Sequence, residues 1–205
     1  MKKTILTLMS FVMTLGIVNV NAQSPLSFGA KLEMNTSNYL LKDLGDQSSK
    51  MKVGPNLTGF MKINVNESFA IQPELSVFYR QSKMEFDNKK DDTFKQWGMQ
   101  IPVYALGQIR SLTGNNFYIG AGPYVGFGFD ARYDDADMSL YKERNGDREM
   151  TRWDFGLATL VGYEFSNGFQ LNAGCQIGFI NQLDALKDDH KMLNQVVNFG
   201  IGYRF

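Results

Sequence analysis

Hydrophobic and polar residues alternate along most of the chain after residue 22. In residues 69–80 the odd positions carry Phe, Ile, Pro, Leu, Val and Tyr, whereas the even positions carry Ala, Gln, Glu, Ser, Phe and Arg. Alternate side chains of a β-strand point to opposite faces of the sheet. The pattern therefore predicts a strand with one apolar face and one largely polar face.

The same alternation recurs along the chain in eight segments, at residues 28–34, 53–63, 69–79, 97–109, 117–129, 153–165, 169–179 and 197–205. Short stretches rich in Asn, Ser and Gly separate some of these segments, at 64–68, 111–116 and 166–168, and they are typical of hairpin turns. The other connections are long and charged, at 37–51, 81–95, 133–150 and 181–193. Alternating short and long connections predict an antiparallel meander with both termini on the short-turn side.

The direction of the apolar face follows from how much a barrel can hold. An eight-stranded barrel is only just wide enough to be filled by side chains, so these large apolar residues cannot all point inward, as they would in a lipocalin-like soluble barrel. Small residues suit the crowded side, and the polar parity carries Gly29, Gly98, Gly120, Gly122, Gly126, Gly128, Gly156, Gly162, Gly174, Gly178, Gly200 and Gly202. We therefore predict an all-β fold, an eight-stranded antiparallel up-and-down transmembrane β-barrel whose apolar face contacts lipid.

Aromatic residues gather near both ends of the predicted outward faces. Strands of about 9–11 residues cross a bilayer when they are tilted, and the predicted segments have about this length. The aromatic residues toward the long loops are Trp97, Trp153, Phe129 and Tyr133. Those toward the short turns are Phe69, Phe117, Tyr163, Phe169, Tyr203 and Phe205. Two such belts are expected at the two interfaces of the outer membrane.

The first 22 residues have the pattern of a secretory signal peptide. Lys2 and Lys3 precede an apolar run from Ile5 to Val18, and Val20-Asn21-Ala22 offers a cleavage site. A retained anchor helix is the alternative, but the run is short for a membrane span. We expect residues 1–22 to be cleaved and residues 23–205 to form the barrel domain, in the outer membrane of a Gram-negative bacterium with both termini periplasmic.

Charge and composition narrow the function classes. With 21 basic and 21 acidic residues the formal net charge is zero, which argues against a nucleic-acid binder. One Cys and one His exclude an internal disulfide and a His-rich metal site. The 43% hydrophobic content and mean hydropathy of −0.26 resemble those of a soluble protein, because averaging merges the two faces of each strand.

Charged residues of both signs fall on the predicted inner face. Near the long loops these are Arg80, Asp130, Arg132, Arg152 and Asp154; at mid-height they are Lys31, Glu33 and Glu74; near the short turns they are Lys62, Arg110, Glu164 and Arg204. Buried charges must be paired to be tolerated, so the favoured interpretation is a salt-bridged plug. A narrow ion path or gated pore is the alternative, since wide channels need about 16 or more strands.

Catalytic and metal sites have little support in the sequence. The single histidine, His190, lies in a long loop, and no Ser or oxyanion site accompanies it as a lipid-modifying enzyme would need. Asp134, Asp135 and Asp137 lack the spacing of a calcium loop. Cys175 is expected to face lipid. We predict no enzymatic activity, no cofactor and no resident metal.

Four prolines lie within the predicted strands, namely Pro55, Pro73, Pro102 and Pro123. Proline removes a hydrogen bond from the strand ladder and normally occurs at edges or bulges. These positions therefore count against the strand prediction unless bulges accommodate them.

Four segments carry a family resemblance: FAIQPELSVFYRQ (69–81), QIPVYALG (100–107), FYIGAGPYVGFGF (117–129) and NFGIGYRF (198–205). They resemble the outer-membrane β-barrel family abundant in Bacteroidetes, often called porin-family or PorT-type proteins. The resemblance covers nearly the whole chain after residue 22 and is weakest in the first strand (28–35). It implies that Pro73, Pro102 and Pro123 belong to the strands, and that Phe205 is the C-terminal signal for the barrel-insertion machinery.

The predicted function is that of a non-enzymatic integral outer-membrane protein with a structural or surface-interaction role. Loops on a rigid scaffold usually carry recognition, so binding of an unidentified extracellular ligand or surface partner is expected at 37–51, 81–95 and 133–150. The other expected partners are outer-membrane lipid and, during assembly, the insertion machinery, with no nucleic acid. A small porin-like channel is the alternative, and a lipid-modifying enzyme is less favoured.

Overall fold

The computed structural model describes the backbone of residues 25–42, 48–86, 89–133, 139–144, 147–148, 150–182 and 191–205. It describes the side chains of residues 25–37, 52–83, 93–133, 139–142, 150–182 and 193–205. The expected signal peptide, residues 1–22, lies outside these ranges.

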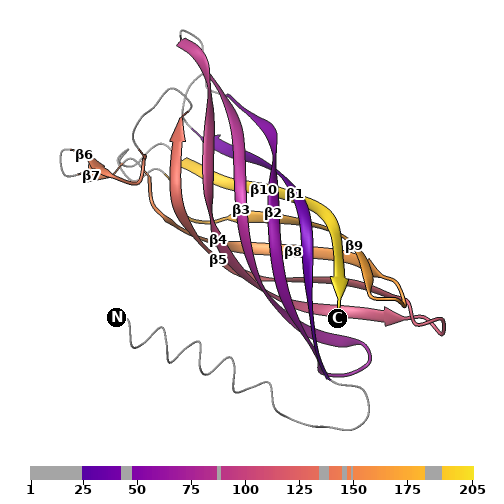
Figure 1. The fold of residues 1–205 in the computed structure, drawn as a ribbon. Coiled ribbons are helices and arrows are strands. Elements are labelled where there is room, and N and C mark those ends of the chain that lie inside the picture. Colours follow the sequence, from indigo (N-terminus) through magenta and orange to yellow (C-terminus); the bar gives the residue numbers. More distant parts are fainter. Residues whose placement is uncertain are drawn as a thin grey trace.

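The described residues form an antiparallel β-barrel. The strands are β1 (Leu26–Lys42), β2 (Ser48–Asn64), β3 (Phe69–Phe86), β4 (Lys89–Arg110), β5 (Asn116–Tyr133), β6 (Glu143–Arg144), β7 (Asp147–Arg148), β8 (Trp153–Glu164), β9 (Phe169–Gly178) and β10 (Lys191–Arg204). Eight strands close the barrel in the order β1-β10-β9-β8-β5-β4-β3-β2, while β6 and β7 pair as a separate small hairpin (Figure 1). This confirms the predicted fold class.

The predicted alternation separates the outside of the barrel from its inside. On the apolar parity, Leu57 is 61% exposed and Leu157 is 52% exposed. On the other parity Lys31 and Gln72 are each only 1% exposed. The first strand follows the same rule, since Phe28, Leu32 and Met34 are exposed while Lys31 is buried. Apolar side chains thus cover the outer surface of the barrel, and polar side chains are buried in its interior.

Short turns join the strands at one end of the barrel, as predicted. Val65–Ser68, Ser111–Asn115 and Phe165–Gly168 connect β2 to β3, β4 to β5 and β8 to β9. Gly114 and Gly168 have φ values of 83° and 88°, which favour glycine. Pro25 and Phe205 lie at this same end, because Asn64 donates to the Pro25 carbonyl and Phe205 donates to that of Phe28.

The strands are longer at the other end than the sequence pattern predicts. β1 and β2 contain 17 residues each and β4 contains 22, so most of the expected loops at 37–51 and 81–95 continue the ladder as strand. Figure 1 shows the β3–β4 hairpin projecting from this end. The prediction failed there because backbone pairing does not require an apolar face once a strand leaves the hydrophobic layer.

The four in-strand prolines lie at interruptions of the ladders. The β2–β3 ladder is interrupted beside Pro55 and again beside Pro73, the β3–β4 ladder at Pro102 and the β4–β5 ladder at Pro123. On the opposite side each proline keeps its partner, which is Met34, Val103, Tyr124 and Leu157, respectively. A missing N–H is tolerated where one ladder lacks a bond. A register shift accompanies only the interruption at Pro55, so a bulge accounts for one of the four positions.

Several inward glycines lie where another group approaches closely. A Cβ on Gly122 would come within 1.8 Å of the Val103 carbonyl oxygen, across the interrupted part of the β4–β5 ladder. By contrast, an added Cβ on the outward Gly59 would meet nothing within 4 Å. The inner glycines therefore allow the curved wall and its contents to pack tightly, as expected for the crowded side of a small barrel.

Candidate functional site in the barrel lumen

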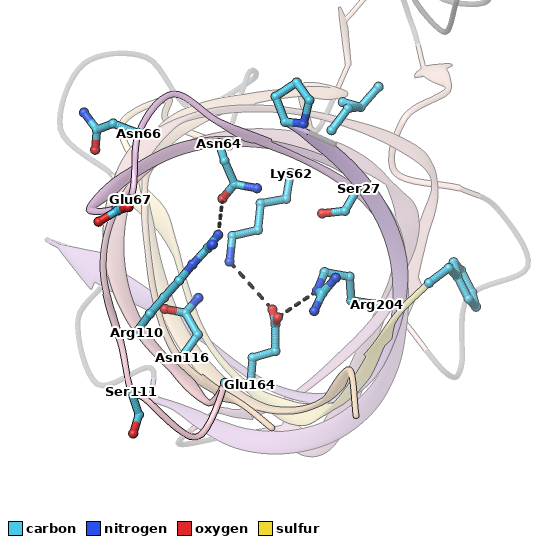
Figure 2. Close-up of a pocket in the computed structure, with 14 residues that line it drawn as sticks. Ser27, Lys62, Asn64, Asn66, Glu67, Arg110, Ser111, Asn116, Glu164 and Arg204 are labelled. Atoms are coloured by element: carbon cyan, nitrogen blue, oxygen red, sulfur yellow. Dashed lines mark hydrogen bonds and ion pairs between the residues drawn. The ribbon is translucent and has the colours of Figure 1, made fainter. Parts of the chain in front are cut away.

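A chamber opens at the short-turn end of the lumen and has a volume of about 700 Å³. Figure 2 shows Lys62, Arg110, Glu164 and Arg204 pointing into it from the wall. The Glu164 carboxylate accepts a hydrogen bond from Arg204 Nε at 2.7 Å, and the Lys62 Nζ atom lies 3.6 Å from its other oxygen. Arg110 donates to the Asn64 side-chain oxygen at 3.0 Å. We call this space the turn-end chamber.

Above the chamber, a buried ion pair joins Lys31 of β1 to Glu74 of β3. Glu74 also accepts a hydrogen bond from Gln72 Nε2 at 2.7 Å, and the Lys31 ammonium lies 5.5 Å from the centroid of the Phe60 ring. A buried ion pair is tolerated when additional hydrogen bonds satisfy the remaining donors and acceptors of the two charged groups. Lys31 and Glu74 are thus two of the predicted inner-face charges, and they form an ion pair with each other.

Glu33 is buried beside this pair but is held by neutral groups. Asn56 donates to its carboxylate at 2.8 Å and Thr58 donates at 3.1 Å. The cavity that remains beside Glu33 and Glu74 has a volume of about 10 Å³. Such a space holds about one water molecule.

Arg80 and Asp154 are held by uncharged side chains, while Arg80 Nε and Asp154 Oδ1 are buried without a hydrogen-bond partner among the described residues. Arg80 donates to Gln100 at 2.6 Å and to Gln176 at 3.2 Å, and its guanidinium lies 3.8 Å from the centroid of the Phe78 ring. Tyr124 donates to Asp154 at 2.8 Å, and Asn194 donates to the same oxygen at 2.9 Å. Among the described side chains, neither charge forms an ion pair. Amides and phenols thus replace the expected salt bridges here.

Aromatic rings also fill the lumen, which the polar interpretation missed. A buried cluster consists of Ala70, Tyr104, Leu106, Tyr118, Tyr124, Ala158 and Leu160. Gly162 leaves a recess for the Tyr118 ring, since an added Cβ would come within 2.2 Å of it. The signal was present in the sequence, because these tyrosines and the lumen glutamines share the inward parity with the charges.

A small apolar cluster lies at the opposite, loop end of the lumen. Phe94, Ala131, Tyr141 and Met150 are buried together, with Tyr141 contributed by the segment after β5. Gln96 donates to the Tyr141 hydroxyl at 2.6 Å, and the Arg152 guanidinium lies 5.0 Å from the Tyr141 ring centroid. Burial raises the pKa of the Tyr141 phenol above its ordinary value. The phenol therefore stays neutral at physiological pH and packs within this loop-end cluster.

Three sequence predictions fail at the end of β5, because the strand contains one extra residue there. Trp97 pairs with Asp130 and the next residue, Gly98, pairs with Gly128, so Phe129 is bulged out of the ladder. A one-residue shift exchanges the two faces. Asp130 and Arg132 therefore pair with each other on the outer side, with 18% and 52% of their side chains exposed. Tyr133 turns inward and packs against Phe94 instead of joining the outer aromatic belt.

The remaining predicted residues lie at the barrel rims and outer wall. Arg152 donates to the Gly128 and Phe129 carbonyls at the loop end, and Arg110 and Arg204 lie at the turn-end mouth. The other predicted outer aromatics lie on the outer wall. They are Trp97, Phe129 and Trp153 at the loop end, and Phe69, Phe117, Tyr163, Phe169, Tyr203 and Phe205 at the turn end. Cys175 is exposed on the outer wall, as expected.

The other candidate chemistry lies outside the described residues. His190, Asp134, Asp135 and Asp137 belong to the loops at 134–138 and 183–190, outside the ranges that the structure describes. Within the described residues, no three His, Cys, Asp or Glu side chains come together as a metal site. In the part of the chain that the structure describes, no helix is long and apolar enough to cross a membrane.

Comparisons with known proteins agree with this architecture. OprG of Pseudomonas aeruginosa is similar in structure, with a TM-score of 0.55 and 14% identity, over 91% of this chain and 99% of that chain. Neisserial surface protein A (NspA) is similar too, with a TM-score of 0.52 and 14% identity, over 89% of this chain and 98% of that chain. At this identity the likeness concerns the fold. No curated protein matches significantly.

A family model described as "Outer membrane protein beta-barrel domain" matches residues 21–184, which is most of the chain. The match includes β1 through β9 and ends before β10, the strand that joins β9 to β1 and closes the barrel. The chain therefore belongs to the outer membrane protein β-barrel domain family, and its barrel is an outer-membrane barrel.

Proposed function

We propose that this barrel has a closed lumen and acts in the outer membrane as a structural or surface-interaction protein, without catalysis. The filling of the lumen is the observation that carries this proposal. Paired charges, amides and tyrosine rings occupy its middle, and the cavity left beside Glu33 and Glu74 measures about 10 Å³. Among the described side chains, the lumen carboxylates are engaged by lysine, arginine, amide and hydroxyl groups.

The surface role would belong to the loop end. The long β1–β2 and β3–β4 hairpins extend the wall there, and loops on a rigid scaffold commonly bind partners. In this proposal the short turns and both termini face the periplasm. The aromatic residues near the two ends of the outer wall would then contact the two membrane interfaces.

We also propose a narrower family for this barrel. The segments at 69–81, 100–107, 117–129 and 198–205 support a place among the PorT-type barrels of Bacteroidetes. The same likeness supports Phe205 as the residue that the barrel-insertion machinery recognises.

Conductance in planar bilayers tests the closed lumen. The refolded barrel is expected to insert without steady ion-conducting openings, because side chains occupy its middle. Heat-modifiable migration on a gel, run on the same preparation, verifies that the protein is folded. Steady openings that are abolished in Arg80→Ala or Glu74→Ala would contradict the proposal, since the current would then pass these residues.

A narrow channel is the second candidate function, and the turn-end chamber favours it. That chamber gives a solute about 700 Å³ of polar space inside one mouth of the barrel. Conduction would require the loop-end cluster around Tyr141 and the tyrosine cluster below it to move aside. The same recording separates the two functions by the presence or absence of steady openings.

A further inference from the structure

The turn-end chamber contains more positive than negative side chains at its inner wall. Lys62 and Arg204 share a single carboxylate, that of Glu164, which also accepts a hydrogen bond from Gln170 at 2.8 Å. Arg110 adds another positive charge, and its described partner is the neutral Asn64 side chain. Arg110 itself is exposed at the mouth of the chamber, so its charge is available to an anion that enters from solvent.

The other carboxylates of the lining, the Glu67 side chain and the terminal carboxylate of Phe205, lie at the exposed rim of the chamber. Glu67 belongs to the exposed hairpin between β2 and β3. Among the described side chains, the ion pairs of the chamber are those of Glu164 alone. Lys62 is only 2% exposed, so neighbouring side chains cover most of it, and Figure 2 shows its ammonium directed toward Glu164.

Unused hydrogen-bond donors point into the same space. The buried Ser27 hydroxyl has no hydrogen-bond partner among the described residues, and Figure 2 shows it directed into the chamber. The Asn64 oxygen accepts from Arg110 and from Gln108, which leaves its amide nitrogen facing the chamber. Neutral donors and cations therefore converge on one cavity, an arrangement that suits the oxygens of an anion.

From this convergence we propose that the turn-end chamber is a binding site for a small oxyanion, a phosphate or carboxylate group. Arg110 and Lys62 would provide the charge, and Ser27 and Asn64 would provide neutral hydrogen bonds. The volume of about 700 Å³ lies within the range of small-molecule sites and exceeds that of a bare phosphate. The occupant is therefore a free anion or the anionic headgroup of a lipid that reaches the mouth of the barrel.

Isothermal titration of the refolded full chain with inorganic phosphate tests this site. The protein is held in a maltoside detergent, which carries no phosphate, at low ionic strength. We expect saturable binding that weakens roughly tenfold in Arg110→Ala, because hydrogen bonds between charged groups are lost. Arg110→Lys keeps the charge and is expected to retain most of the affinity.

Arg132→Ala is the matched control, because it removes an exposed arginine at the other end of the barrel. Its phosphate affinity is expected to equal that of the parent protein. A second titration uses dihexanoyl phosphatidic acid, a short-chain lipid, below its critical micelle concentration. Tighter binding of this lipid than of phosphate, with the same loss in Arg110→Ala, would identify a headgroup as the occupant, and equal or weaker binding would identify a free anion.

Two outcomes would overturn the proposal. One is an absence of phosphate and lipid binding by parent protein that migrates as folded on the gel. The other is binding that is weakened equally by Arg110→Ala and Arg132→Ala, since the anion would then respond to overall charge and not to the chamber. Neither outcome concerns conduction, so the site and the closed lumen are tested separately.

Discussion

Lys31→Met is expected to lower the free energy of unfolding by about 3–5 kcal/mol, the usual effect of removing one partner from a buried ion pair. The substitution keeps the length of the side chain but leaves the Glu74 carboxylate without its cation. Glu33 lines the same small cavity, so two buried carboxylates would then lie together without a positive charge. Urea titration in lipid vesicles, followed by heat-modifiable migration, measures the loss.

Two further variants make this result specific. Lys31→Met combined with Glu74→Leu is expected to recover most of the lost stability, because replacing both members of a buried pair is often nearly neutral. Arg132→Ala breaks the exposed Asp130–Arg132 pair and is expected to cost less than about 1 kcal/mol. A loss in Lys31→Met no larger than that in Arg132→Ala would mean that the lumen pair is hydrated and that the lumen is open.

Leu157→Arg is expected to destabilise the folded barrel by about 2–4 kcal/mol, as arginine does on the lipid-facing side near the middle of a bilayer. Leu157 is 52% exposed on the outer wall, and it lies centrally in β8 between Trp153 and Tyr163. The same urea titration reports this loss. The effect should be present in vesicles, where hydrocarbon surrounds the wall.

The control for the lipid-facing variant lies at the turn end. Leu112 is fully exposed in the hairpin between β4 and β5, beyond the strands. Leu112→Arg is expected to change stability by less than about 1 kcal/mol, because the penalty falls toward the interface. Equal losses in the two variants would contradict a membrane placed around the middle of β8.

The outer and inner faces were predictable because two different solvents act on them. Lipid selects large apolar side chains on one parity, and the narrow lumen selects glycines and polar groups on the other. Leu157 and Lys31 are on their predicted faces for this reason. The argument holds only where the barrel wall lies in the membrane.

The failures arose where that selection is absent or where a single residue disturbs it. The strands continue through 37–42 and 81–86, but there the parity that is apolar in the membrane segments becomes largely polar, with Gln81, Lys83 and Glu85 in β3, so the alternation could not reveal them. The bulge at Phe129 exchanges the faces of Asp130, Arg132 and Tyr133, and the sequence pattern contains no signal for that insertion. The partners of Glu33 and Arg80 depend on which strands are neighbours across the lumen, which no local pattern reports.

The most direct test of the lipid-facing wall uses tryptophan fluorescence in vesicles made with lipids brominated near the middle of their chains. In a background of Trp97→Phe and Trp153→Phe, a single tryptophan is placed outward by Leu157→Trp or inward by Tyr124→Trp. We expect the brominated lipids to quench the outward tryptophan strongly and to leave the inward one nearly unchanged, because Tyr124 is only 2% exposed within the lumen. Equal quenching of the two, or quenching of the outward tryptophan by aqueous acrylamide, would contradict a barrel whose apolar face contacts lipid.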